Sequence, residues 1–325
     1  MRLLINRKVV DGAWGGGNAF VRAFRELMPL HGHTVVDSLA DRPDLIILVG
    51  PERDTHTVGF SEAMIHRLKH PGCKIILRVN DCDARKGTQG VDSKLMSIGS
   101  QCDGIVFVST WLKDYMMERW HTDIAQTAAL VHRHGVTFDA DTYKNNLIQI
   151  ATVIHNGVDR SLFRPVPFEE NNLLRVVAHH WSDNSMKGRD VYEALDRTPG
   201  IEFTYIGRHK CNFTGRRTNV LPPLTGEPLA RALAANRVYV SGSLWDPGPN
   251  HVLEALSCGI TTWVHRNGGG AVEFAGSDHT YGSVDELRSI LFDHRRVRAH
   301  NTYVPTGWDE CITQYARVFE GVVSK

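Results

Sequence analysis

Residues 245–259 place a turn-rich loop directly before a helix-forming segment. They read Trp245-Asp246-Pro247-Gly248-Pro249-Asn250-His251-Val252-Leu253-Glu254-Ala255-Leu256-Ser257-Cys258-Gly259. The preceding β-branched and aromatic run, 238–241, is typical of a strand. Turn residues occupy 246–249, and 250–257 is helix-forming up to a stop at Gly259. The pattern predicts a strand, a loop and then a helix that begins at the carboxyl end of that strand.

Two carboxylates, Asp246 and Glu254, lie eight positions apart around this predicted helix start. A helix amino terminus directs backbone N–H groups and the positive end of its dipole at a ligand, which is commonly a phosphate. Carboxylates repel phosphates, so we expect these two to accept hydrogen bonds from hydroxyl groups on either side of one. A ligand with hydroxyls on both sides of a diphosphate is a nucleotide sugar.

The rest of the chain alternates strand-like and helical patterns, which predicts α/β architecture with parallel sheets covered on both faces. We expect one domain at 1–160 and a second at 161–325, joined near a polar, proline-containing link at 164–172. Residues 124–147 fit the alternation poorly, and we treat them as an insertion. In such sheets ligands bind outside the carboxyl ends of the strands, so two facing domains would hold the ligand in the cleft between them.

Composition narrows the functional class. The chain has 325 residues, with 37 basic and 36 acidic side chains and a net charge of +1, so no global field favours nucleic acid or an anionic membrane. Its six cysteines are widely spaced, which is typical of a reducing cytosol. The apolar run at 3–5 is too short for a signal peptide, and no run is long enough for a membrane helix. We expect a cytoplasmic protein, with peripheral membrane contact left open.

Several motifs occur together in one order, and jointly they resemble those of retaining glycosyltransferases of the family-four type, also called glycosyl transferases group 1. The segment 246–254 is similar to the Glu-x7-Glu signature of that family, with Asp246 in place of the first Glu. The similarity covers most of the chain. The other matching motifs are Gly15-Gly16-Gly17-Asn18, Val108-Ser109-Thr110-Trp111-Leu112, Ile154-His155-Asn156-Gly157-Val158-Asp159, Lys187-Gly188, and Gly268-Gly269 with Glu273.

The resemblance implies the GT-B fold, with two facing Rossmann-like doubly wound domains and a last helix, about 309–323, that crosses back to the first domain. It implies a retaining, metal-independent transfer of sugar from a UDP- or GDP-sugar to a hydroxyl acceptor on a glycan, a lipid-linked sugar or a protein-linked sugar. No cofactor beyond the donor is expected. Retention without a carboxylate nucleophile implies front-face attack, in which the departing phosphate takes the acceptor proton.

The resemblance also assigns roles to residues. Asp246 would contact the donor sugar, Glu254 the ribose and Lys187 the leaving diphosphate, and these three are the expected catalytic residues. Donor binding is expected from Gly16, Gly17, Lys187, Arg208, Pro249, Asn250, His251, Val252, Glu254, Gly269 and Glu273.

The residues alone are also compatible with purely structural interpretations. The glycine triplet at 15–17 is also compatible with a flexible turn, Lys187 with a solvated surface lysine, and Glu273 with a helix cap. On the acceptor side we expect Asn80, Asp81, Arg85 and Lys86, although an ordinary charged loop would have the same composition. The sequence Asp81-Cys82-Asp83 resembles an Asp-x-Asp metal motif, which we interpret as a coincidence.

Three positions depart from the family pattern. Asp246 replaces Glu, Ser182 stands where relatives carry an Arg, and Asn80 stands where many carry a His. The positive charge missing at Ser182 would then come from His179, His180, Arg189 or Arg208. The departures keep two alternatives in view, a catalytically silent module that binds nucleotide sugars or glycans, and a sugar-nucleotide epimerase of the same fold.

Overall fold

The computed structural model describes residues 1–12, 14–51, 58–167, 173–214 and 218–324. The chain forms two compact units. The first contains Met1–Val10, Gly17–His155 and Asp309–Lys325, and the second contains Asp11–Gly16 and Asn156–Trp308. Residues 168–172 of the predicted link lie outside the described residues.

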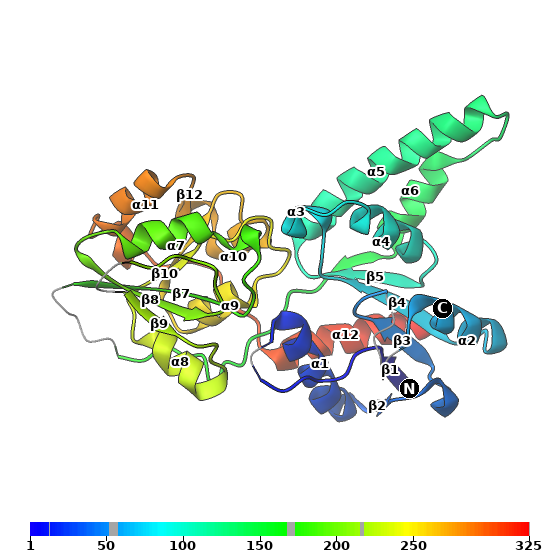
Figure 1. Ribbon diagram of the computed structural model, residues 1–325. Coiled ribbons are helices and arrows are strands. Elements are labelled where there is room, and N and C mark those ends of the chain that lie inside the picture. Colours follow the sequence, from blue (N-terminus) through cyan, green and yellow to red (C-terminus); the bar gives the residue numbers. More distant parts are fainter. Residues whose placement is uncertain (13, 52–57, 168–172, 215–217, 325) are drawn as a thin grey trace. The chain divides into compact units, whose positions relative to one another are not determined.

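The first unit is built on a six-stranded sheet with the order β2-β1-β3-β4-β5-β6 (Figure 1). All of its strand pairs are parallel. The strands are β1 (Arg2–Ile5), β2 (Thr34–Val36), β3 (Leu45–Leu48), β4 (Lys74–Val79), β5 (Gly104–Phe107) and β6 (Ala151–Val153). Parallel strands connected by helical crossovers are buried on both faces, which explains the continuous apolar runs at β3 and β5.

Helices cover both faces of this sheet. They are α1 (Gly16–Leu27), α2 (Phe60–Lys69), α3 (Asp83–Lys86), α4 (Val91–Gly99), α5 (Thr110–Arg133), α6 (Ala140–Gln149) and α12 (Trp308–Val323), with short 3-10 turns η1 (Met28–His31) and η2 (Leu39–Asp41). The final helix packs on α1 through Phe20 and Tyr315, whose ring centroids are 4.9 Å apart. It also reaches β5, because a Cβ on Gly104 would lie 3.7 Å from Val322.

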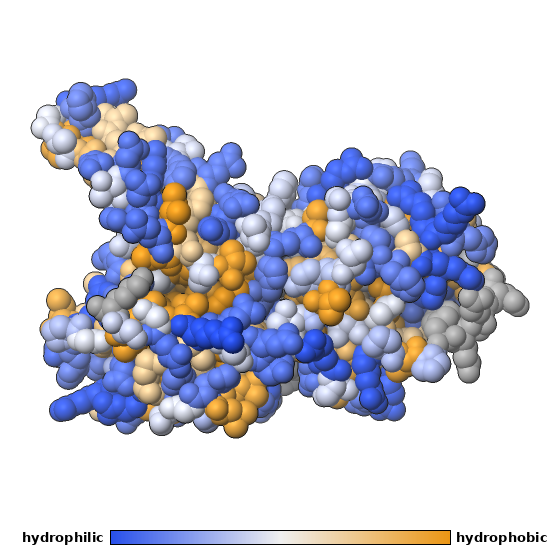
Figure 2. All heavy atoms as spheres, turned by 180° about the vertical axis from the view of Figure 1, so that it is seen from behind, coloured by the Kyte–Doolittle hydropathy of each residue, from blue (hydrophilic) through white to orange (hydrophobic). Residues whose placement is uncertain are grey.

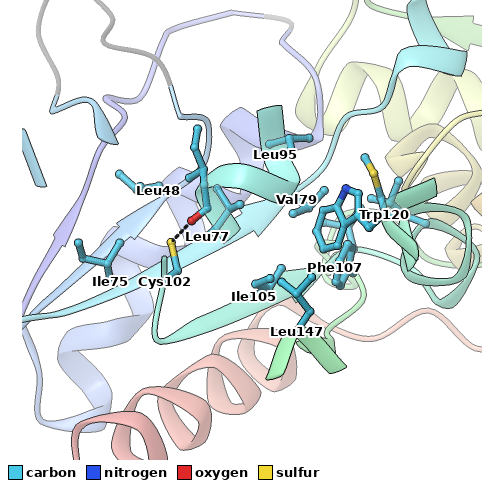
Figure 3. Packing of buried hydrophobic residues seen from close by; sticks show 14 of the residues in the cluster. Leu48, Ile75, Leu77, Val79, Leu95, Cys102, Ile105, Phe107, Trp120 and Leu147 are labelled. Carbon is cyan, nitrogen blue, oxygen red and sulfur yellow. Dashed lines mark hydrogen bonds between the residues drawn. The ribbon is translucent and has the colours of Figure 1, made fainter. Parts of the chain in front are cut away.

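The core beneath α4, α5 and α6 is shown in Figure 3. Trp120 of α5 is fully buried, lies 5.7 Å from the ring of Phe107 on β5, and donates its indole N–H to the Asp92 carbonyl at 2.9 Å. Burying both the ring and its polar group with a partner is how a core tryptophan is normally accommodated. Trp120 therefore belongs to the core of the first unit.

The stretch 124–147, treated above as an insertion, forms the distal half of α5 and most of α6. Helix α5 runs without a break from Thr110 to Arg133 and so continues into this stretch. The two helices project side by side from the rest of the first unit (Figure 1). Ile124 and Leu147 of this hairpin are buried in the core, and Phe138, Ala140 and Tyr143 pack against it while partly exposed. Most of its other side chains are polar, so the hairpin lacks the apolar spacing that identifies a sheet-covering helix.

The second unit has a six-stranded sheet with the order β12-β11-β10-β7-β8-β9, again parallel throughout. Its strands are β7 (Leu174–His180), β8 (Ile201–Gly207), β9 (Thr218–Leu221), β10 (Val238–Ser241), β11 (Thr261–His265) and β12 (Thr280–Tyr281). Its helices are α7 (Arg189–Asp196), α8 (Gly226–Ala234), α9 (Asn250–Ser257), α10 (Gly270–Ala275) and α11 (Val284–Leu291), with 3-10 turns η3 (Ser185–Lys187), η4 (Ser277–His279) and η5 (Arg296–Arg298).

Two apolar clusters fill the two faces of this second sheet. Side chains of α8, α9 and α10 pack on one face around Tyr239 and Val264. Those of α7 and α11 pack on the other around Val240 and Trp263. The predicted strand at 238–241 and helix at 250–257 are confirmed residue for residue.

Within the described residues, we find no helix that is long and apolar enough to span a membrane. On the face drawn in Figure 2, apolar residues form separate patches within a mainly hydrophilic surface.

Candidate functional site

The strand order of the second unit identifies where a ligand would bind. From β7 the chain adds β8 and β9 on one side, and then returns to place β10 on the other side of β7. Open α/β sheets bind ligands outside the carboxyl ends of the strands at such a reversal. The candidate site therefore lies after His180 of β7 and Ser241 of β10.

The loop after β10 holds Asp246 in a fixed backbone conformation. Its N–H donates to the Gly268 carbonyl at 3.2 Å, and its own carbonyl accepts from the Gly270 N–H at 2.8 Å. The neighbouring Trp245 has φ 53°, a left-handed conformation that a bulky side chain rarely adopts. Such strain persists only where surrounding contacts determine the backbone, and it is concentrated at functional sites.

Lys187 and Asp246 form a buried ion pair. Nζ of Lys187 lies 2.5 Å from Oδ2 of Asp246, and the side chains are 9% and 7% exposed. The main chain brings them together, because the Leu244 N–H donates to the Met186 carbonyl at 2.8 Å. Desolvating two charges offsets most of their attraction, so a buried ion pair is a weak source of stability. Its place at the strand reversal is better explained by binding or catalysis.

Glu254 is held by a second contact that crosses the site. Its Oε2 lies 2.8 Å from Nε2 of His179, the penultimate residue of β7. The Glu254 side chain is 21% exposed and that of His179 is 9% exposed. The two carboxylates of the sequence signature thus have different partners, a lysine for Asp246 and a histidine for Glu254.

The start of α9 is braced by the motif at 154–159. The Asn156 side chain donates to the Gly248 carbonyl at 3.1 Å and to Oδ1 of Asn250 at 2.8 Å. Asn250 in turn donates to the Gly157 carbonyl at 3.3 Å. Pro249 is the N-cap without a side-chain cap, and its carbonyl accepts the Val252 N–H at 3.1 Å.

The glycine-rich motifs contact these elements closely. A Cβ on Gly16 would lie 2.1 Å from Oδ1 of Asn250, so a side chain here would displace the Asn250 side chain from its contact with Asn156. Gly17, in the first unit, would place a Cβ 3.4 Å from the Asn80 side chain. Gly269 forms a β-bridge with Asp246. These approaches favour a structural need for glycine at 16 and 269 over a merely flexible turn.

His180 lies beneath the site and is fully buried in an aromatic cluster. Burial lowers the pKa of His180 well below its ordinary value, and His251 and Lys187 lower it further. Its Nε2 is 2.5 Å from the Tyr192 hydroxyl, which accepts the Gly242 N–H at 2.9 Å. Because burial lowers the pKa of His180 well below its ordinary value, the imidazole is neutral near pH 7. It does not supply the positive charge missing at Ser182.

This burial makes stability fall on acidification. Below about pH 6.5 an unfolded histidine binds a proton that folded His180 does not, so protonation stabilises the unfolded state relative to the folded state. We expect the free energy of unfolding to fall more steeply with decreasing pH in the wild type than in His180→Gln, by up to about 1.4 kcal/mol per pH unit. Urea unfolding at several pH values compares the slopes, and identical slopes would contradict a neutral buried His180. The other histidines with pKa values lowered by burial contribute equally to both proteins, namely His33, His66, His265 and His279.

Of the remaining donor-side residues, Arg208 is exposed and lies over the ring of Trp14, 5.7 Å from its centroid. Glu273 lies in the first turn of α10. Arg189, the last of the suggested charge donors, pairs with Glu193 at 2.8 Å on the surface. The structure therefore brings Lys187, Asp246, Gly269, Glu254 and the start of α9 together.

The residues expected to contact an acceptor lie in the first unit, in the loop after β4 and in α3. Asp81 pairs with Arg85, Nη1 to Oδ1 3.3 Å, and with Lys86. Asp83 accepts the backbone N–H groups of Val91 and Asp92 and so braces the start of α4. Burial alone would raise the pKa of Asp83, but these hydrogen bonds and one from the Thr88 hydroxyl stabilise the carboxylate, so its pKa is lowered. Across the described ranges, no three His, Cys, Asp or Glu side chains are placed to hold a metal ion.

Sequence reasoning does not reveal the partners of two site residues, Asn156 and His179. Asn156 belongs to the motif at 154–159, but its bracing of α9 depends on a contact 94 positions away. His179 is expected to supply positive charge to a phosphate, whereas its partner is a carboxylate 75 positions away. Both side chains are buried polar groups, and such groups are normally hydrogen-bonded, but a sequence does not reveal the partner.

No protein-family model and no curated protein matches the sequence. Solved structures match along nearly its whole length. Anabaena HepE in complex with UDP and glucose has a TM-score of 0.66 at 14% identity, covering 99% of this chain and 100% of that one. The catalytic domain of Arabidopsis thaliana starch synthase IV, bound to ADP and acarbose, has a TM-score of 0.67 at 11% identity, covering 100% and 99%. Sucrose-phosphate synthase from Thermosynechococcus elongatus has a TM-score of 0.63 at 14% identity, covering 99% of each chain.

These likenesses extend over both units, and each unit has a six-stranded parallel sheet with helices on both faces. The sheet order of the second unit is that of a Rossmann domain. The chain therefore has the GT-B fold, with two Rossmann-like domains.

Proposed function

We propose that this protein is a retaining glycosyltransferase that moves a sugar from a nucleotide-sugar donor to a hydroxyl acceptor. The observation that carries the proposal is the placement of Asp246 and Glu254 around the start of α9, beside the strand reversal of the second unit. Lys187 contacts the first of these carboxylates. The cation and the helix start can bind a diphosphate, and the carboxylate on either side can accept hydrogen bonds from hydroxyl groups. This arrangement matches the chemistry of a nucleotide sugar.

Each residue then has a role in binding the donor. Lys187 and the backbone at the start of α9, around His251, bind the diphosphate, Glu254 accepts a hydrogen bond from the ribose, and Asp246 accepts one from the sugar. The solved structures with this fold support the type of ligand, since HepE was solved with UDP and glucose and the starch synthase with ADP and acarbose.

The reaction breaks the bond between the anomeric carbon and the β-phosphate oxygen and forms one from the acceptor oxygen to the same carbon. The acceptor proton passes to the departing phosphate oxygen on the same face, which retains the configuration. Negative charge grows on the diphosphate as the bond breaks, and a fixed cation beside it stabilises that charge. Lys187 supplies this charge without a metal ion in the proposed mechanism.

The acceptor is proposed to be a hydroxyl of a glycan, free or linked to lipid or protein, and Asn80, Asp81, Arg85 and Lys86 are proposed to contact it. The enzyme would act in the cytoplasm, where nucleotide sugars serve as donors, with peripheral membrane contact if the acceptor is lipid-linked.

A thermal-shift panel of UDP-, GDP- and ADP-sugars tests the proposal. A ligand that binds only the folded state stabilises it by about 2.7 kcal/mol at a hundred times its Kd. We expect one base class to raise the unfolding temperature and the matching donor to be consumed when a suitable acceptor is added. If a donor stabilises the protein but is not consumed with any acceptor, a catalytically silent binding module is favoured. Isomerisation of the donor sugar would favour an epimerase. No shift with any donor, in folded protein, would reject nucleotide-sugar binding.

A further inference from the structure

The contact between His179 and Glu254 suggests a function for His179 other than supplying positive charge to the diphosphate. This inference rests on the proposed function, because it concerns how Glu254 recognises the donor. Glu254 lies on α9 and His179 on β7, the strand beside which the chain reverses. A single hydrogen bond thus joins the carboxylate to the sheet.

The imidazole of His179 is rigidly placed. Its ring packs edge-on against Tyr239, with centroids 5.5 Å apart, and against His251 at 6.0 Å. The Tyr239 hydroxyl also donates to the His179 carbonyl at 3.3 Å. A ring fixed on two sides restricts the carboxylate that binds it to one direction.

The hydrogen-bonding pattern also determines which ring nitrogen carries the proton. Nε2 faces Oε2 of Glu254, so it must donate. Nδ1 is buried without a hydrogen-bond partner among the described residues. A proton there would bury an unsatisfied N–H, which costs more than an unused lone pair. His179 therefore acts as a hydrogen-bond donor to Glu254 through Nε2.

We propose that His179 is a positioning residue that orients Glu254 toward the two adjacent hydroxyls of a ribose. A carboxylate has about four acceptor positions on its two oxygens. With one direction of Oε2 taken by His179, the remaining positions face outward, where the 21% exposed Glu254 side chain can accept from a ligand. The ligand class is therefore a ribonucleoside diphosphate, distinguished from the 2′-deoxy form by this carboxylate.

Calorimetric titration of four proteins tests the inference, using the nucleoside diphosphate of the preferred base, its 2′-deoxy analogue and inorganic pyrophosphate. The proteins are wild type, His179→Ala, Glu254→Ala and the double variant. Losing a hydrogen bond to a charged group costs about tenfold in affinity. We expect His179→Ala to weaken ribonucleotide binding by about this factor, to reduce discrimination against the 2′-deoxy analogue, and to leave pyrophosphate binding unchanged. The double variant should bind no more weakly than Glu254→Ala, because both changes remove one interaction.

Two further variants separate positioning from a general effect on the fold. His179→Gln retains an N–H at similar reach and should restore most of the affinity. His279→Ala removes an equally buried imidazole, packed on Trp263 just before β12, and should leave all affinities unchanged.

The inference is overturned if His179→Ala binds the ribonucleotide as tightly as wild type. It is also overturned if the fold loss of affinity in the double variant equals the product of the losses in the two single variants. It is also overturned if Gln fails to restore binding in a folded protein. A wild type that binds pyrophosphate but shows no preference for any nucleoside diphosphate would reject the proposed function itself, which distinguishes the two failures.

Discussion

Replacing Asp246 with Asn is expected to lower the rate of sugar transfer by about a hundredfold or more, the usual cost of losing one group that stabilises a transition state. The amide has the same size but no charge, so it accepts a weaker hydrogen bond from the sugar. It also ceases to balance the buried charge of Lys187, 2.5 Å away. Because Asp246 is assigned to the sugar and not to the nucleotide, the loss should fall on kcat, and the Kd for the free nucleoside diphosphate should change little.

Steady-state kinetics and nucleotide titration of the same preparation check this result. Asp285→Asn provides a matched control, since Asp285 is exposed and pairs with Arg288 on the surface of α11. That variant should keep full activity. Full transfer by Asp246→Asn would remove Asp246 from the mechanism, and an equal loss of nucleotide affinity would assign it to the diphosphate region instead.

Gly269→Ala is expected to have the second large effect. Gly269 has φ 68° and ψ −131°, and an added Cβ would lie 2.8 Å from the Asp246 carbonyl oxygen and 2.9 Å from its nitrogen. Both neighbours are backbone atoms that cannot rotate away, so the loop holding Asp246 must move. Backbone strain of this kind costs about 1–3 kcal/mol. We expect a loss of stability in that range and a fall in transfer activity of at least about tenfold, because a displacement of about 1 Å at a reacting group is costly.

Gly276→Ala separates the collision from backbone strain. Gly276 also has a positive φ, 90°, yet an added Cβ would meet no atom within 4 Å. This variant should lose stability by a similar conformational cost while keeping its activity. If Gly269→Ala remained as active as Gly276→Ala, the contact between the glycine loop and Asp246 would not matter for function.

The sequence predicts the local elements of this fold well where pattern and chemistry agree. The segment 250–257 is bounded by turn residues before it and a glycine after it, and the helix has these limits. The strand 238–241 is apolar throughout because helices cover both faces of its sheet. Signals of this kind act over a few residues, so they can be read without knowing the tertiary structure.

The contacts that build the site are long-range and could not be read in the same way. The pairs Lys187 with Asp246 and His179 with Glu254 join residues 59 and 75 positions apart. Which cation meets which carboxylate depends on strand order, which no local pattern encodes. The left-handed Trp245 is a similar case, because its conformation is imposed by hydrogen bonds from the loop at 267–270.

A crystal structure of the protein with the nucleoside diphosphate of its preferred donor would test the central proposal most directly. We predict that the ribose hydroxyls lie within hydrogen-bond distance of Glu254, with the diphosphate between Lys187 and the backbone at the start of α9. Density for the nucleotide away from the carboxyl ends of β7 and β10, or with Glu254 turned away from the ribose, would contradict this account of the site.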